Sequence, residues 1–202
     1  MTGRLSNKKE KSIIEAARKR FAHYGFSKVT MEEIATDVEM GKASLYYYFT
    51  TKERLFQAVI AVEQQEFVRE VESILQKNIL AAQKLHEYVG KRLRYFQELL
   101  NLGTLSVHSF FNIKSVFKKS FNNFEKQELL LLTRILSEGR ATKEFNNKLP
   151  KETAIVLLHI LQGLRLRTLK KIKGQQLDEK SYKNLQKEMT LAIDIFIKGI
   201  KR

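Results

Sequence analysis

The stretch VTMEEIATDVEMGKASLYYYF, residues 29–49, determines the fold class of this 202-residue chain. Thr30 followed by Glu33 is a capping box, which predicts that a short helix begins there. Residues 39–41 interrupt the helical spacing of apolar side chains, and a second short helix is predicted over residues 42–48. Two short helices joined by about three residues and packed on a longer helix are typical of a helix-turn-helix, whose second helix fits the major groove of DNA.

Helical signals continue on both sides of this stretch. Asn7 followed by Glu10 predicts a helix start, and Gly25 is expected to be the left-handed C-terminal cap of that helix. Thr50 followed by Glu53 is a further capping box, which predicts a long helix. Apolar residues recur at intervals of three and four along the rest of the chain, and strand-like alternation is scarce. We therefore expect an all-α protein of about nine helices, the later ones over residues 79–101, 104–118, 122–139, 151–173 and 179–200.

The composition excludes several kinds of protein and site. The chain has no Cys, so it has no disulfide, thiolate zinc site or Cys nucleophile, which fits a reducing compartment. The longest unbroken apolar runs, such as residues 154–158, are far shorter than the ~20 residues of a membrane span. Residues 1–15 are polar and basic, without the apolar region of a signal peptide. We expect a cytoplasmic protein with no membrane partner.

The chain is strongly basic, with 37 Lys and Arg against 22 Asp and Glu and a net charge of +15. Such a charge favours polyanionic partners, including nucleic acid. The excess is largest at the C-terminal end, because residues 140–202 carry 15 basic and 6 acidic side chains, whereas residues 1–50 carry 9 and 6. Local geometry must therefore provide most of any DNA binding by the helix-turn-helix, with bulk charge assisting.

The N-terminal part of the chain resembles the DNA-binding domain of the TetR family of bacterial regulators. The resemblance rests on Phe21, on Gly25 and on three stretches: VTMEEIA (29–35), KASLYYYF (42–49) and KERL (52–55). It implies a three-helix DNA-binding domain over residues 8–68, with the helix-turn-helix at about 30–49. Residues 69–202 would then form a helical domain for effector binding and dimerisation.

The turn between the two short helices departs from the family's usual Ala-Gly-Val-Ser. Here it is VEMG (38–41), so Glu39 takes the place of Gly, and Gly41 takes the place of the capping Ser. A non-Gly residue in a left-handed turn costs about 1 kcal/mol, and Gly is only slightly worse than Ser as an N-cap. These changes affect the detail of the turn and leave the expected fold intact.

The resemblance also implies which residues contact DNA. Lys42, Ala43, Ser44 and Tyr46 align with base-facing positions of the family's second helix. Tyr47, Tyr48 and Lys52 align with positions that meet phosphates or the groove edge, and Thr30 lies beside the DNA backbone. Glu32 aligns with a position that reaches a base in some members, but stabilisation of the helix dipole is the preferred interpretation of its carboxylate.

The C-terminal part carries the candidate effector site. Residues 88–124 hold eight of the chain's twenty aromatic side chains, and core packing is the preferred role for most of them. The resemblance places a pocket among the helices between residues 52 and 139, and bundle helices commonly enclose ligand sites. Nearby Lys and Arg side chains suggest that the unknown small-molecule effector is an amphipathic anion, such as a fatty acid or an acyl thioester, with Arg165 at its head group. The candidate pocket residues are Tyr88, Tyr95, Phe96, His108, Phe111, Phe117 and Arg165.

Dimerisation is expected through the last two helices, residues 151–173 and 179–200. Residues 154–166 leave little polar face, and a helix that is apolar on most sides must be covered on most sides. A four-helix bundle between two copies would cover it and would match the two-fold symmetry of a palindromic DNA site. We place Leu161 in this interface and expect Gly163 to permit close approach of the helices.

The resulting hypothesis is a homodimeric repressor that a small molecule releases from a double-stranded, palindromic operator. A basic protein that coats DNA without sequence preference is one alternative, and an all-helical enzyme is another. The sequence shows no acid/base or nucleophile constellation, and its four His lie at no recognised metal-site spacing. We therefore expect no enzymatic activity, no metal and no cofactor.

Overall fold

A computed structural model of the chain describes residues 2–103, 118–171 and 178–201. These residues form eight α-helices and no strand, as the sequence predicts for an all-α protein. The predicted helix over 104–118 lies almost entirely outside the described residues. The helices are α1 (Thr2–Tyr24), α2 (Met31–Asp37), α3 (Lys42–Tyr48), α4 (Lys52–Leu75), α5 (Ala81–Gly103), α7 (Lys118–Ala141), α8 (Pro150–Lys171) and α9 (Glu179–Ile200).

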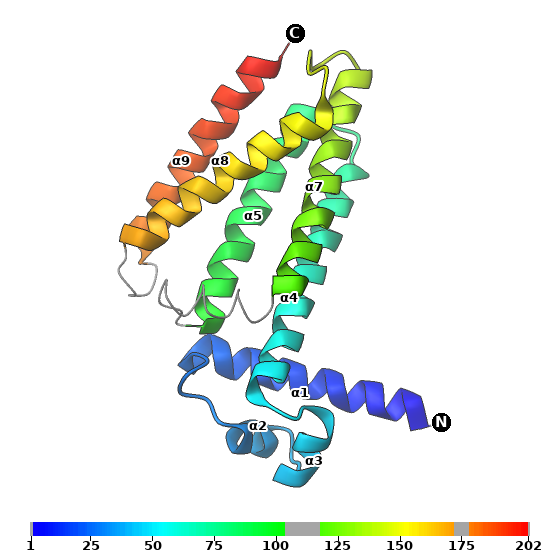
Figure 1. Ribbon diagram of the computed structural model, residues 1–202, viewed down its shortest axis with the longest axis vertical. Coiled ribbons are helices and arrows are strands. Elements are labelled where there is room, and N and C mark those ends of the chain that lie inside the picture. Colours follow the sequence, from blue (N-terminus) through cyan, green and yellow to red (C-terminus); the bar gives the residue numbers. More distant parts are fainter. Residues whose placement is uncertain (1, 104–117, 172–177, 202) are drawn as a thin grey trace.

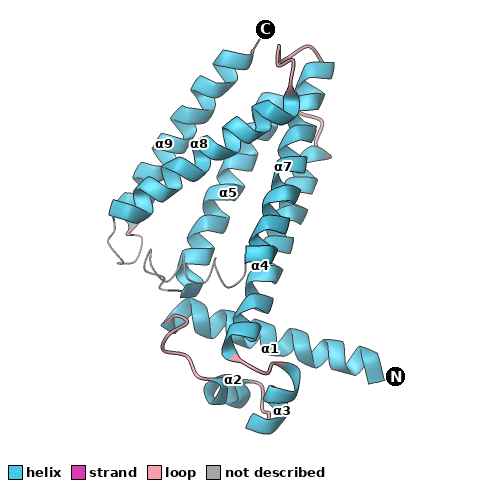
Figure 2. Ribbon diagram, in the orientation of Figure 1, coloured by secondary structure: helices cyan, strands magenta, loops and turns pink. Residues whose placement is uncertain are grey.

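The helices form two groups that share α4 (Figures 1 and 2). Helices α1, α2 and α3 lie together at one end of the molecule. Helix α4 begins beside them and runs into a bundle with α5, α7, α8 and α9, and α1 packs against both α4 and α5. Helix α4 therefore contacts helices of both groups.

The small core of the first group comes from the apolar positions that the spacing indicates. Leu45 and Phe49, four residues apart, are both buried, as is Ile34 of α2. They join Phe21 of α1, whose ring meets the ring of Phe56 of α4 edge-on at 5.2 Å between centroids. This core fixes α3 against α2 and α1 while leaving the outer side of α3 uncovered.

The local signals in the turns are largely confirmed. The side chain of Thr30 accepts a hydrogen bond from the backbone of Glu33, and the Glu33 carboxylate accepts one from the backbone of Thr30, which completes the capping box. Gly25 adopts a left-handed backbone with φ of 81°, and Glu39 does so with φ of 53°. Gly41 is the N-cap of α3 and supplies no side-chain cap.

Two predicted helix starts are wrong. Helix α1 begins at Thr2 instead of near Asn7; residues 2–6 contain no Pro, the residue that would stop a helix. The N-cap of α4 is Thr51, whose side chain accepts from the backbone N–H of Arg54 at 3.1 Å, and not Thr50. Since Phe49 turns inward to the core, the chain needs one more linking residue before α4 can start.

Candidate nucleic-acid interface and buried cavity

Helix α3 presents an uncovered face on the outside of the molecule. Lys42, Ala43, Ser44 and Tyr46 are all exposed, and Tyr47, at 84%, is the most exposed large apolar or aromatic side chain among the described residues. Leu45 alone on this helix is buried. The structure therefore brings the predicted base-facing residues together on one accessible surface, which we call the α3 face.

Two adjacent Tyr side chains of α3 pack one on the other, with Tyr48 toward the core and Tyr47 toward solvent. Tyr48 is half-buried and packs against the core, and its ring meets that of Tyr47 edge-on at 5.5 Å. This contact braces a ring that otherwise projects into solvent. A Tyr held in this way can donate its hydroxyl to a phosphate while its ring stays in place.

Lys42 is not free on this surface, because its ammonium group forms an ion pair with the Glu32 carboxylate of α2. The hydrogen bond between them raises the pKa of Lys42 and lowers that of Glu32. The ammonium also lies 6.0 Å from the centroid of the Tyr46 ring. The pair could not be predicted from the sequence, because the turn between α2 and α3 sets the distance between the two side chains.

Lys52 has a role that the resemblance does not indicate. Its ammonium group donates hydrogen bonds to the backbone carbonyls of Phe26, at 2.9 Å, and Val29, at 3.0 Å. The same group lies 4.5 Å from the centroid of the Phe26 ring. Two of its three N–H bonds thus hold the loop that leads into α2, and contact with a phosphate is at most a second role. Thr30, beside this loop, is exposed but already shares its hydroxyl with Glu33.

Helices α1–α3 are tied to the bundle by ion pairs between α1 and α4. Arg18 of α1 lies with its Nε 2.5 Å from an oxygen of Glu63 and with a terminal nitrogen 3.0 Å from an oxygen of Glu66. Glu63 is buried, and burial raises its pKa despite the opposing effect of Arg18. The next residue along α4, Gln64, accepts a hydrogen bond from Ser120 of α7 at 3.2 Å.

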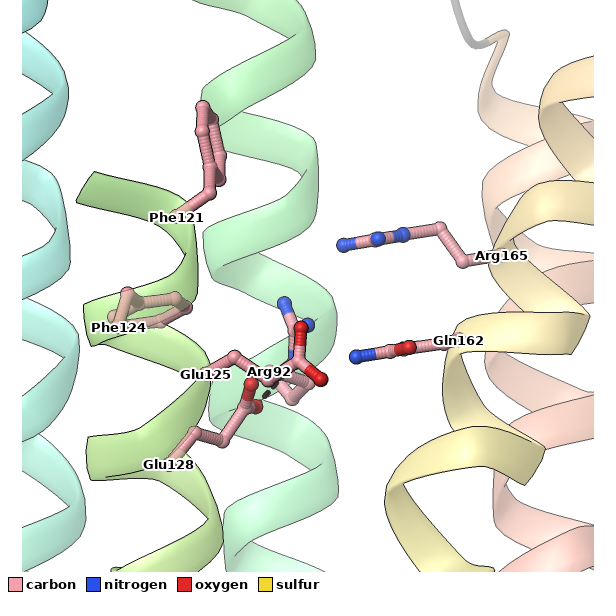
Figure 3. Close-up of a pocket in the computed structure, with 7 residues that line it drawn as sticks. All are labelled: Arg92, Phe121, Phe124, Glu125, Glu128, Gln162 and Arg165. Atoms are coloured by element: carbon pink, nitrogen blue, oxygen red, sulfur yellow. Dashed lines mark ion pairs between the residues drawn. The ribbon is translucent and has the colours of Figure 1, made fainter. Parts of the chain in front are cut away.

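A small cavity lies between α5, α7 and α8 (Figure 3). Its volume is about 30 Å³, which is room for one or two water molecules and far below the ~300–1,000 Å³ of a pocket for a drug-sized ligand. Arg165 and Gln162 point from α8 toward α5 and α7. The lining residues are Arg92, Phe121, Phe124, Glu125, Glu128, Gln162 and Arg165.

Charged side chains are buried beside this cavity. Arg92 of α5 forms an ion pair with Glu128 of α7, and the Tyr88 hydroxyl donates to the same Glu128 oxygen at 2.6 Å. Burial opposes the charge of Arg92, but Glu128 and Tyr88 outweigh burial and raise its pKa. Arg165 is only 9% exposed, and burial together with the nearby Arg92 lowers its pKa to about 10.

Of the predicted pocket residues, Arg165 lines the cavity, whereas Tyr88, Tyr95 and Phe96 do not. Tyr88, Tyr95 and Phe96 are buried in the packing of the bundle instead. Helix α5 turns their side chains into its contacts with neighbouring helices; the ring of Tyr95, for example, lies 5.2 Å from that of Phe67 of α4. His108, Phe111 and Phe117 lie outside the described residues.

Glu125, Glu128 and Gln162 also line the cavity and were not predicted from the sequence. A signal for the buried charges was present, because each stands on the apolar stripe of its helix. Glu128 follows Phe124 by four residues and precedes Leu132 by four, and both neighbours are buried. A charge inside such a stripe indicates a buried polar contact.

An uncovered apolar face runs along α8 and α9. Val156 and Ile160 of α8 and Leu191 and Ile195 of α9 are exposed, the last two by about 60%. Gly163 is exposed beside them, and a Cβ placed there would meet no atom within 4 Å. The placement of Leu161 in an interface is wrong, because it is 1% exposed within a single protomer. No helix in the described part of the chain is long and apolar enough to span a membrane.

Comparison with known proteins gives consistent results. Residues 13–59 match the family model "Bacterial regulatory proteins, tetR family". A transcriptional regulator from Cytophaga hutchinsonii is 45% identical in sequence over 94% of this chain and 97% of its own, and its crystal structure superposes with a TM-score of 0.88. The transcriptional regulator YhgD of Bacillus subtilis is 24% identical over 79% of this chain and 84% of its own.

A more distant structure is that of the repressor SmeT of Stenotrophomonas maltophilia in complex with triclosan. It is 16% identical, covers 96% of this chain and 92% of its own, and superposes with a TM-score of 0.63. At this identity the likeness concerns the fold alone.

Proposed function

Because the chain belongs to the TetR family of bacterial transcriptional regulators, we propose that it is a homodimeric repressor that binds a palindromic operator and is released from it by a small molecule. It is a helix-turn-helix regulator of transcription. The observation that carries the proposal is the α3 face, a short helix with one buried and several exposed side chains at the end of the molecule.

The α3 face supports direct recognition of base pairs. An α-helix fits the major groove of B-DNA, where each base pair presents its own pattern of donors and acceptors. We assign the exposed Lys42, Ala43, Ser44 and Tyr46 to base edges, and Tyr47 and Tyr48 to phosphates. Lys42 can leave Glu32 for a guanine because both groups are exposed, and an exposed ion pair contributes little.

The α8–α9 face supports the dimer. Four exposed apolar side chains on two adjacent helices form a surface that a second copy would cover, with Gly163 allowing the helices to approach closely. A two-fold axis there would present two α3 faces to two half-sites, as a palindromic operator requires.

The contacts of helix α4 support the proposal that an effector bound in the bundle changes DNA binding. We place the boundary between the DNA-binding domain, residues 8–68, and the effector domain, residues 69–202, within this helix. Gln64 of α4 contacts α7 beside the cavity, and the adjacent Glu63 is held by Arg18 of α1. A ligand that separated α7 from α8 would shift α4 and α1 together. Release then requires only that the ligand favour a conformer whose α3 helices no longer match the groove spacing.

The proposed function is tested by selecting bound DNA fragments and then measuring affinity for selected and random duplexes. Lys42→Ala and Ser44→Ala are each expected to lose about 1–3 kcal/mol on selected DNA, and much less on random DNA. Lys180→Ala, an exposed charge on α9, is the control and should leave the preference unchanged. Equal losses on both kinds of DNA would indicate a protein that coats DNA without reading its sequence.

A further inference from the structure

We propose that Glu32 and Lys42 read one base pair of each operator half-site together, as an ion pair that stays intact in the major groove. The Glu32 carboxylate accepts a hydrogen bond from the amino group of a cytosine, and the Lys42 ammonium donates to O6 and N7 of the guanine paired with it. This inference rests on the proposed function above and deepens it, because it names the base pair that the two side chains select.

The ion pair lies at the end of α3 that approaches the bases. In a helix-turn-helix, the first residues of the second helix contact base edges in the major groove, while the first helix crosses the DNA backbone. Lys42 is the first residue of α3, and Glu32 is the second residue of α2. Both side chains are more than half exposed, so a base pair can reach both without displacing any side chain of the core.

The backbone on both sides of the ion pair is held in place. The capping box of Thr30 and Glu33 fixes the first turn of α2 around Glu32. The backbone N–H of Met40 donates to the carbonyl of Ala35 at 2.9 Å, which ties the turn to α2 just before α3 begins. The two side chains therefore start from fixed positions, and less ordering is needed when DNA binds.

The two groups have opposite hydrogen-bonding character. Their mutual hydrogen bond raises the pKa of Lys42 and lowers the pKa of Glu32, so both are charged at neutral pH. An ionised carboxylate only accepts hydrogen bonds, and an ammonium only donates them, through three N–H bonds. Since Lys42 gives one N–H bond to Glu32, two remain for a base, and the ion pair need not separate.

A C·G base pair matches this arrangement when the cytosine faces Glu32. In the major groove the N4 amino group of cytosine is a donor, and it lies next to the O6 acceptor of its guanine, which has a second acceptor at N7. The carboxylate then meets the donor, and the two free N–H bonds of Lys42 meet the two acceptors. Each polar group on the edge of the base pair thus finds a partner while the ion pair remains.

The other three arrangements fit less well (the base written first faces Glu32). G·C and T·A each place a carbonyl oxygen against the carboxylate and an amino group against the ammonium, and like partial charges repel. A·T keeps an amino group for Glu32 and a carbonyl for Lys42. It replaces guanine N7 with the thymine methyl group, however, and sets adenine N7 beside the carboxylate. The expected order of affinity is C·G first, A·T second, and G·C and T·A last.

The test starts from operator DNA obtained by selection with the full-length protein. At each position of one half-site the base pair is changed in turn to the other three, and affinity is measured by competition in fluorescence anisotropy. We expect one position at which the wild type shows the order above, with about tenfold weaker binding of G·C than of C·G.

Variants assign each contact to its side chain. Glu32→Gln should reduce the discrimination against G·C at this position to about threefold or less, because an amide both donates and accepts hydrogen bonds. Lys42→Met should reduce the preference for C·G over A·T at the same position. Replacement of the guanine by 7-deazaguanine, which lacks N7, should weaken binding by the wild type and leave binding by the Lys42→Met variant unchanged.

Glu33→Gln is the matched control. It removes the same charge from the next residue of α2, whose carboxylate accepts hydrogen bonds from Thr30 instead of pairing with Lys42, and Gln also completes a capping box. This variant should leave the preference at the position unchanged. An equal effect of Glu33→Gln and Glu32→Gln would reduce the result to net charge and overturn the inference.

Two further outcomes would overturn the inference. One is a preference for a base pair other than C·G at the position that both variants affect, and the other is that Glu32→Gln and Lys42→Met act at two different positions. The proposed function is judged by a separate variant. If Ser44→Ala changes the preference on selected DNA as expected, sequence-specific binding stands and only the reading by Glu32 and Lys42 fails. Equal losses of Ser44→Ala on selected and random DNA would count against sequence-specific binding itself.

Discussion

The guanidinium of Arg18 on α1 holds the buried carboxylate of Glu63 on α4, with 2.5 Å between Nε and Oε1. This pair joins the DNA-binding helices to the bundle one residue away from Gln64, which contacts α7. A buried charge keeps a partner at a defined position because losing it is costly. The pair therefore fixes the orientation of α1 against α4, which in turn packs against α7.

Replacing Arg18 with Met should destabilise the protein by about 2–3 kcal/mol at about pH 8, because it leaves the charge of Glu63 buried without its partner. Urea unfolding measures this loss. Lys77→Met is the matched control, since its pair with Glu87 is exposed on both sides and should contribute less than about 1 kcal/mol.

The same variant has a predicted pH dependence. The pKa of Glu63 is already raised by burial, and loss of Arg18 should raise it further. A carboxyl group whose folded pKa exceeds its unfolded value favours folding when protonated, and this contribution is lost as the pH rises through the folded pKa. The destabilisation by Arg18→Met should therefore be smaller at about pH 5 than at about pH 8. A loss independent of pH would contradict this account of Glu63.

Replacing Lys52 with Met should lower the free energy of unfolding by about 1–2 kcal/mol, because two backbone carbonyls lose a charged donor. The slope of log affinity for DNA against log salt should stay nearly unchanged. Lys28→Met, exposed in the same loop, should leave stability unchanged. A slope reduced by about one, with no loss of stability, would instead assign Lys52 to a phosphate.

Replacing Glu32 with Gln should strengthen binding to random DNA, because it removes a negative charge of α2 that lies beside the α3 face and releases Lys42. Stability should hardly change, because an exposed ion pair contributes little. Fluorescence anisotropy with random and selected duplexes measures both effects on binding. Lost discrimination at a single base pair would mean that Glu32 accepts a hydrogen bond from a cytosine.

Placing charge on the α8–α9 face should separate the proposed dimer. Ile160→Glu and Leu191→Glu should each give folded monomers in sedimentation equilibrium, because a charge buried in an interface is costly. Leu130→Glu, on an exposed position of α7, should stay dimeric. Leu161→Glu is expected to unfold the protomer, since Leu161 is buried within it. A dimer that persists in both interface variants would place the interface elsewhere.

The local structure could be predicted from the sequence wherever interacting groups lie within four residues of each other. The capping box of Thr30 and Glu33 and the left-handed Gly25 depend on short-range hydrogen bonds and backbone sterics. The inward positions of Leu45 and Phe49 follow from the period of the helix. Local rules placed the start of α4 at Thr50 and failed by one residue, because the burial of Phe49 decides where the linking residue lies.

The pairs that link helices were decided only by the tertiary structure. Lys52 reaches carbonyls 23 and 26 residues earlier, Arg18 reaches a carboxylate on another helix, and Lys42 meets Glu32 across a turn. Helix α8 is apolar on most sides, so its sequence could not tell the buried Leu161 from the exposed Ile160. Packing against α7 and α9 determines that Leu161 is buried and Ile160 is exposed. Periodicity specifies which residues share a face of a helix, and only the neighbouring helices determine which face is covered.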